Sequence, residues 1–194
     1  MEPIRAFIAI ELPDQVKENL RRLQGQLRQA GGPDGIGVRW VNPDGIHLTL
    51  KFLGNVAADK IPAVTQAMNQ AAEGTGALAL ATTGLGAFPN WRRVRVLWVG
   101  LEGDLERLQA LQKRLEQGLK PLGFPPEGRS FSPHLTLGRM REHMAPEEIR
   151  RFEEAISALG VESTQPWVAD SLNLMRSELR PSGAVYSRMA SARL

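Results

Sequence analysis

The tetrapeptide His-Leu-Thr-Leu occurs twice in the chain, at residues 47–50 and again at residues 134–137. The two copies use two of the three histidines of the sequence. Side chains on a β-strand alternate between its faces, so each histidine shares a face with its threonine and the leucines take the other face. The pattern predicts two strands that pack leucine against a core and present an imidazole and a hydroxyl on the opposite side.

The elements predicted around the two copies recur at a nearly constant offset. A first unit comprises strand 4–10, a helix capped by Asp14, strand 46–53, helix 58–71 and strand 78–81. A second comprises strand 93–99, a helix capped by Asp104, strand 134–139, helix 146–159 and strand 172–176, before a final strand 185–190. The two histidines lie 87 residues apart and the two caps 90. This spacing indicates an internal duplication.

The duplication predicts an α+β fold with two pseudo-symmetric lobes. We expect largely antiparallel sheets, helices on the outer face and a central cleft. No low-complexity segment or long linker separates the halves, so residues 1–194 are interpreted as one bilobal domain. If a pseudo-twofold axis relates the lobes, the two imidazole–hydroxyl pairs can meet across the cleft.

Composition limits the kinds of protein that this chain can be. The 194 residues include 42% hydrophobic ones, yet no apolar run approaches the ~18 residues of a membrane-spanning helix. The first residues do not resemble a signal peptide, so we expect no membrane association and a cytoplasmic location. The absence of cysteine excludes disulfides and thiolate metal sites.

Arginine dominates the basic residues, with 19 Arg against 5 Lys in a chain of net charge +3. Arginine can bind phosphate through two parallel hydrogen bonds, so the bias mildly supports a phosphate-bearing partner. A general preference for arginine on the surface explains the count equally well.

Two imidazoles and two hydroxyls are sufficient for acid–base chemistry at a phosphate. Imidazole titrates near pH ~6.5, so one ring can be charged while the other is neutral. One can then take a proton from water while the other gives one to a leaving oxygen, and threonine hydroxyls can donate to phosphoryl oxygens. A metal site is the rival interpretation of the histidine pair. No Cys or Asp/Glu cluster stands near them at ligand spacing, so we expect neither metal nor cofactor.

The sequence around the two copies resembles the RNA 2′,3′-cyclic phosphodiesterase family of the 2H phosphoesterase superfamily, also called the bacterial and archaeal 2′-5′ RNA ligase family. The resemblance spans nearly the whole chain, and the four motif positions match. It rests on Arg-Ala-Phe-Ile-Ala-Ile at 5–10, His-Leu-Thr-Leu-Lys-Phe-Leu-Gly at 47–54, Arg-Val-Leu-Trp at 95–98 and Phe-Ser-Pro-His-Leu-Thr-Leu-Gly-Arg at 131–139.

The resemblance implies an enzyme that hydrolyses RNA 2′,3′-cyclic phosphate ends to a 2′-phosphate, with reversible 2′-5′ ligation as a further activity. It makes His47 the proton donor and His134 the proton acceptor, with Thr49 and Thr136 beside them. Spacing alone does not fix which histidine does which. The implied partner is RNA with a 2′,3′-cyclic phosphate terminus, and we expect a monomer. Two alternatives stay open: a non-catalytic RNA-end or nucleotide-binding protein, and a phosphodiesterase for small cyclic nucleotides or 2′-5′ oligoadenylates.

Arginines near the second motif are candidates for phosphate binding. Arg139 lies five residues beyond His134, so strict alternation places it on the opposite face, and we favour Arg129 in the preceding loop. Arg93 and Arg95 alternate with valines, which predicts a basic face on strand 93–99.

Three phenylalanines near the motifs could stack an RNA base. These are Phe7, Phe52 and Phe131, although core packing explains each of them. Alternation with Leu50 predicts that Phe52 belongs to the core. We assign no role to His143.

Overall fold

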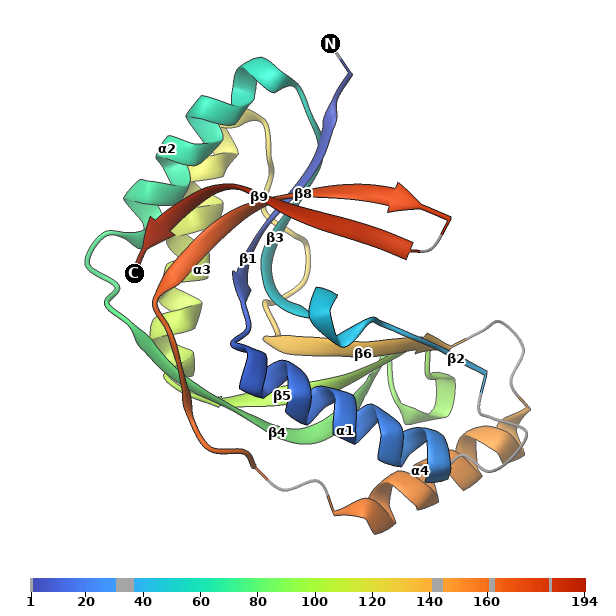
Figure 1. The fold of residues 1–194 in the computed structure, drawn as a ribbon. Coiled ribbons are helices and arrows are strands. Elements are labelled where there is room, and N and C mark those ends of the chain that lie inside the picture. The colour runs from blue at the N-terminus through green and yellow to red at the C-terminus, as the bar shows by residue number, and fades with distance from the viewer. Residues whose placement is uncertain (1, 31–36, 141–144, 161–162, 182) are drawn as a thin grey trace.

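The computed structural model describes residues 2–30, 37–140, 145–160, 163–181 and 183–194 (Figure 1). His143 therefore lies outside the described residues. The first half contains β1 (Ile4–Glu11), α1 (Asp14–Ala30), β2 (Val38–Trp40), η1 (Pro43–Gly45), β3 (His47–Val56), η2 (Ala58–Lys60), α2 (Ile61–Ala72) and β4 (Leu78–Phe88). The second contains η3 (Trp91–Arg93), β5 (Val96–Gly103), α3 (Leu105–Leu119), η4 (Lys120–Leu122), β6 (His134–Met140), α4 (Pro146–Leu159), β7 (Trp167–Ala169), β8 (Ser171–Arg180) and β9 (Gly183–Arg193).

The strands form two antiparallel sheets, with the orders β3-β1-β8-β9 and β2-β6-β5-β4-β7. Each sheet combines strands from both halves of the chain. β8, from the second half, pairs with β1, and β4, from the first half, pairs with β5 (Figure 1). The last strand of each predicted unit has thus joined the sheet of the other unit.

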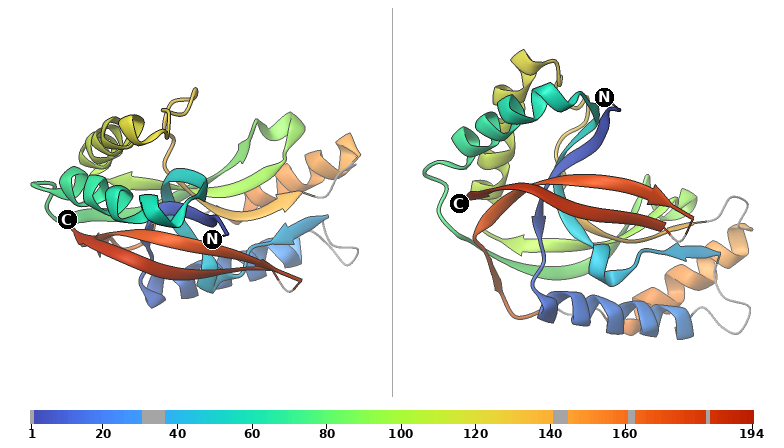
Figure 2. Two further views of the ribbon diagram at one scale, coloured as in Figure 1. Left: turned by 90° about the horizontal axis from the view of Figure 1, so that it is seen from above. Right: turned by 45° about the horizontal axis from the view of Figure 1, so that its top comes forward.

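The helices cover the outer sides of the sheets in all views (Figures 1 and 2). α2 packs against α3 and α1 against α4, so each pair also takes one helix from each half. Leucines at helical spacing, such as Leu20 and Leu27 in α1 and Leu108 and Leu115 in α3, are almost fully buried in one continuous core. The predicted α+β fold with two lobes is confirmed.

Several element boundaries differ from the predicted ones. β4 runs to Phe88 instead of ending near Ala81, because it pairs with β5 over this length, where Gly86 lies opposite Trp98 and leaves room for its indole ring. A Cβ at that position would lie 2.1 Å from Cζ2 of Trp98. The short strands β2 and β7 were not predicted. No helix in the described part of the chain is long and apolar enough to cross a bilayer.

The predicted basic face on strand 93–99 is wrong. The side chain of Asn90 accepts a hydrogen bond from the backbone N–H of Arg93 at 3.1 Å and starts the 3₁₀ turn η3 instead. β5 begins only at Val96, so Arg93 and Arg95 are exposed residues outside the strand.

Each motif strand carries a β-bulge directly after its threonine. In β3, Thr49 pairs with Ala9 and Lys51 with Ile8, which leaves Leu50 as the extra residue. In β6, the corresponding extra residue is Leu137. A bulge reverses the alternation of side chains beyond it, because two consecutive residues turn to the same face.

The bulges overturn two predictions. Phe52 is not a core residue: its side chain is 60% exposed, while Lys51 takes the core position at 2%. Arg139 is not on the opposite face from His134, because its strand partner is Val96, which shares a face with Trp98 and the histidine.

Candidate active site

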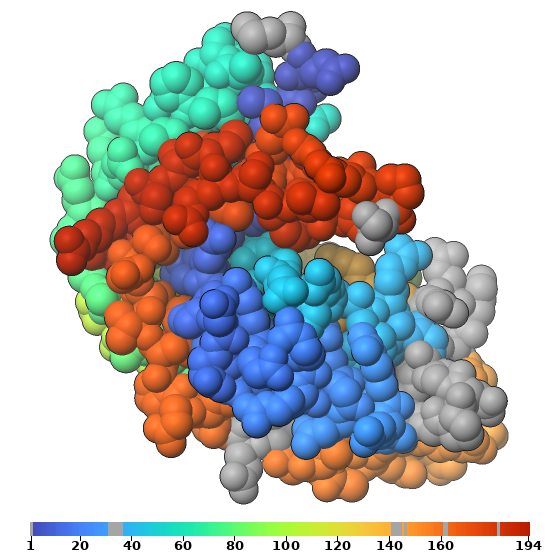
Figure 3. Space-filling model, viewed as in Figure 1, coloured from blue at the N-terminus to red at the C-terminus, as the bar shows by residue number. Residues whose placement is uncertain are grey.

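The two motif strands present their histidines and threonines as the alternation predicts. The four motif leucines are 0–3% exposed in the core, whereas the histidines and threonines are half-buried on the other face. β3 and β6 belong to different sheets, yet they approach within 8 Å between Cα atoms. The surface is hollowed between the β8–β9 hairpin (red) and the segment around η1 and β2 (cyan and light blue), with β6 visible inside (Figure 3).

Both imidazoles are oriented by the same backbone contact. Nδ1 of His47 lies 2.8 Å from the carbonyl oxygen of Gly45, and Nδ1 of His134 lies 2.7 Å from that of Ser132. A carbonyl oxygen can only accept, so each Nδ1 donates its proton. Each Nε2 is then left to accept or donate a proton elsewhere, which is what a general base or acid requires.

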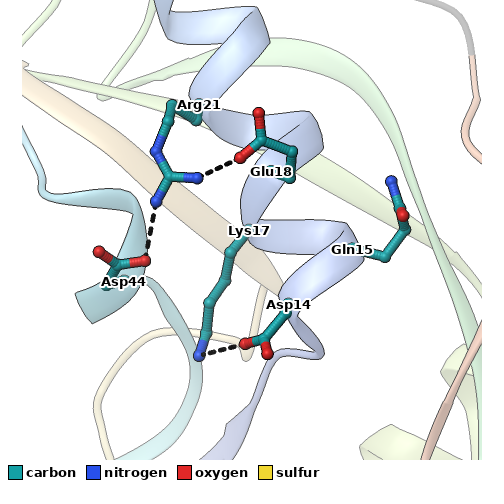
Figure 4. Close-up of a pocket in the computed structure, with 6 residues that line it drawn as sticks. All are labelled: Asp14, Gln15, Lys17, Glu18, Arg21 and Asp44. Carbon is teal, nitrogen blue, oxygen red and sulfur yellow. Dashed lines mark hydrogen bonds and ion pairs between the residues drawn. The ribbon is translucent and has the colours of Figure 1, made fainter.

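The turn that supplies the Gly45 carbonyl is fixed to α1. In η1 the side chain of Asn42 accepts from the backbone N–H of Asp44, and the carboxylate of Asp44 pairs with Arg21 at 2.8 Å (Figure 4). A pocket of about 400 Å³ lies here, and its charged lining residues are already paired with one another (Figure 4). We therefore interpret this cluster as support for the first motif and not as a ligand site.

Aromatic rings pack against both imidazoles. The His47 ring stacks on Phe7 with centroids 4.5 Å apart and meets the edge-on ring of Tyr186 at 5.0 Å. The His134 ring lies 4.8 Å from Phe88 and 5.9 Å from Trp98. These contacts exclude water from one side of each imidazole, and this favours the neutral ring.

Burial lowers the pKa of both histidines below the usual range, but the neighbouring charges act in opposite directions. The carboxylate of Glu11, directly across the strand pair from His47, opposes the lowering of the His47 pKa, as does the bond to Gly45. The guanidinium of Arg139 adds to the lowering of the His134 pKa. Burial thus disfavours a proton on both rings, while the neighbouring charges favour one on His47 and disfavour one on His134.

The remaining predicted site residue, Arg129, is exposed in the connection between η4 and β6. It lines a cavity of about 420 Å³ between this connection and α3, and neither histidine lines that cavity. The structure thus brings Arg139, rather than Arg129, to the face that carries the second motif.

Sequence reasoning missed Glu11 and the aromatic rings other than Phe7. The duplication offered no signal for Trp98, because the residue of β1 that pairs with the threonine of the first motif, as Trp98 pairs with Thr136, is Ala9. Glu11 is held by Arg188 of β9, whose Nε and Nη2 lie 2.7 and 2.6 Å from the same carboxylate oxygen. That contact joins residues 177 positions apart and has no local signature.

The described residues contain no group of three or more His, Asp or Glu side chains arranged to hold a metal ion.

Comparison with known proteins places the chain among the phosphoesterases, a class of hydrolases. The family model of LigT-like phosphoesterases matches twice, at residues 10–98 and 99–186. The chain belongs to this family, and the two matches confirm the duplication.

Similar proteins extend over the full length of the chain. It is 32% identical to an RNA 2′,3′-cyclic phosphodiesterase of Methanothermobacter thermautotrophicus, over 98% of this chain and 99% of the relative. It is 30% identical to a Thermotoga maritima protein of the same name, over 94% of this chain and 91% of the relative. The crystal structure of TT0787 of Thermus thermophilus superposes with a TM-score of 0.77, 26% identity and 98% coverage of both chains. Escherichia coli LigT complexed with 3′-AMP gives a TM-score of 0.76 at 25% identity, over 100% of this chain and 99% of that one.

Proposed function

We propose that this phosphoesterase hydrolyses the 2′,3′-cyclic phosphate at the end of an RNA to a 2′-phosphate without a metal ion. The observation that carries the proposal is the matched anchoring of two imidazoles, each bound through Nδ1 to a carbonyl two residues earlier. The names of the relatives, and the 3′-AMP bound to the Escherichia coli neighbour, support this substrate class.

The proposed reaction uses one histidine for each proton. Nε2 of His134 takes a proton from water as the water oxygen bonds to phosphorus. The bond between phosphorus and the 3′ oxygen breaks, and Nε2 of His47 gives its proton to that oxygen. Glu11 beside His47 and Arg139 beside His134 support this assignment, because they favour the acid form of the first and the base form of the second.

The threonine hydroxyls and an arginine complete the proposed site. Thr49 and Thr136 share the faces of their histidines and would donate hydrogen bonds to the non-bridging phosphoryl oxygens. Arg139 adds positive charge on the same face, and Arg129 stays a proposed contact to the RNA outside the reacting phosphate. If the 5′-hydroxyl of a second RNA replaced water as the nucleophile, the bond from phosphorus to the 3′ oxygen would break and a 2′-5′ linkage would form. The same site would catalyse this step in both directions.

We also propose that the enzyme acts as a monomer in the cytoplasm. Light scattering at micromolar concentration tests the first statement, since a mass near twice the 21.4 kDa of one chain contradicts it.

An assay with three substrates in the presence of a chelator tests the proposal. These are an RNA oligomer with a 2′,3′-cyclic phosphate end, a 2′,3′-cyclic mononucleotide and a 2′-5′ oligoadenylate. We expect the oligomer to give a 2′-phosphate with the highest kcat/KM, at a rate that the chelator does not change. Binding without turnover would establish the non-catalytic alternative, and a preference for either small substrate would reassign the substrate. Loss of activity that zinc restores would overturn the metal-free mechanism.

A further inference from the structure

A buried ion pair lies directly beneath the first motif strand. Lys51 is 2% exposed and Glu116 of α3 is 8% exposed, and their charged groups are 2.8 Å apart. The second carboxylate oxygen of Glu116 accepts from Gln112 at 3.0 Å. Removing two charges from water is costly, so such a pair adds little stability compared with apolar side chains of similar size.

The fold does not require a charged side chain at this position of the bulge. The corresponding residue after the second motif is Gly138, where a Cβ would lie 2.5 Å from Cγ1 of Val38. At the second bulge, the space beside Gly138 is filled by Val38. At the first bulge, the corresponding space is filled by the side chain of Lys51, which ends in a buried ammonium.

The ammonium of Lys51 has a second partner outside the core. Its Nζ lies 2.6 Å from the carbonyl oxygen of Pro125, at the start of the connection between η4 and β6. This connection, residues 123–133, has no regular secondary structure and stands away from the body of the protein (Figure 2, left). From Pro125 to Pro133, all of it described, only two backbone carbonyls are bound: Pro125 by Lys51, and Ser132 by His134.

Phe124 and Phe131 pack against the core near the two ends of this loop, but the stretch between them has little support. A cavity of about 510 Å³ lies on the side of Phe52 and Lys60, and the cavity of about 420 Å³ lies on the side of α3. Most residues from Pro125 to Ser132 are exposed. Between the two phenylalanines, the hydrogen bond from Lys51 to Pro125 is therefore the main polar contact that fixes the path of the chain.

We propose that Lys51 is a positioning residue for the second motif. Glu116 holds the ammonium of Lys51, and the ammonium fixes the carbonyl of Pro125. The loop that starts there carries Arg129 and ends at Ser132, whose carbonyl accepts from the imidazole of His134. A residue two places beyond Thr49 would then set the orientation of the other histidine, which couples the two halves of the site. This inference rests on the proposed function for its kinetic readout.

The double substitution Lys51→Met with Glu116→Met tests this role, because it removes both charges and keeps the volume of the side chains. We expect the melting temperature to be kept or raised, since apolar residues replace a buried ion pair. We expect kcat on the cyclic-phosphate oligomer to fall about tenfold, as displaced catalytic groups lose alignment, with a smaller change in KM. Amide hydrogen exchange should accelerate in residues 123–133. A kcat equal to that of the wild-type protein in the folded double variant would contradict the proposal.

Two single substitutions complete the test. Glu116→Gln keeps the shape of the side chain but removes the charge that holds Lys51, so kcat should fall about threefold and loop exchange should accelerate. If the double variant does not fold, unchanged kcat and unchanged exchange in Glu116→Gln overturn the proposal. Lys120→Met is the control, because Lys120 is an exposed lysine at the start of η4 and its replacement should leave kcat unchanged. An inactive wild-type protein would contradict the proposed function instead. The hydrogen-exchange data would still test whether Lys51 holds the loop.

Discussion

The two copies of the motif hold their histidines in the same way but surround them with different charges. Each ring is bound through Nδ1 to a carbonyl two residues earlier and packs against two aromatic rings. Across from the first stands the carboxylate of Glu11, and near the second stands the guanidinium of Arg139. A duplication gives two equal imidazoles, and the difference in neighbouring charge is what the proposed division into acid and base rests on.

Removing either histidine should produce the largest effect. His47→Ala and His134→Ala should each lower kcat/KM by ~10²–10⁴-fold, because each loses one positioned proton transfer. A substrate with sulfur in place of the 3′ oxygen separates the two, since a thiolate leaves without protonation. It should restore much of the rate in His47→Ala and little in His134→Ala. The opposite pattern would reverse the assigned roles, and a normal rate in either variant on the natural substrate would remove that residue from the chemistry.

The threonines should be more nearly equivalent than the histidines. Thr49→Val and Thr136→Val keep the branched shape on each strand and remove only the hydroxyl. Each should lower kcat by about 10²-fold through loss of one donor to the phosphoryl oxygens, with an unchanged melting temperature. A full rate in a folded valine variant would show that this hydroxyl only fills space.

The charge difference between the halves should be visible in the pH dependence of kcat/KM. Glu11→Gln removes the carboxylate that opposes the lowering of the His47 pKa, so that pKa falls and the basic limb moves to lower pH. Arg139→Gln removes a cation that lowers the His134 pKa, so that pKa rises and the acidic limb moves to higher pH. If the roles were exchanged, Glu11→Gln would move the acidic limb and Arg139→Gln the basic one. Glu2→Gln, at an exposed residue, serves as the control.

The sequence was sufficient to predict the fold class, the duplication and which face of each motif strand carries the histidine and threonine. These features follow from local periodicity and from a repeated tetrapeptide. The sequence could not predict the bulges at Leu50 and Leu137, since an extra residue in a strand leaves no mark in an apolar run. For that reason Phe52 was wrongly placed in the core and Arg139 on the wrong face. Partners from distant parts of the chain, such as Glu11 and Arg188, were equally invisible, because only the completed sheet brings them together.

The exchange of β4 and β8 between the sheets bears on the ancestry of the fold. A lone ancestral unit would leave its first strand with an open edge, and open edges recruit strands from other chains. Two such units complete each other by trading their last strands, as in a domain-swapped homodimer. The present chain has the connectivity expected if such a dimer was later joined end to end in a single gene. Neither half of the chain would then fold without the other, because each supplies a strand to the sheet of the other half.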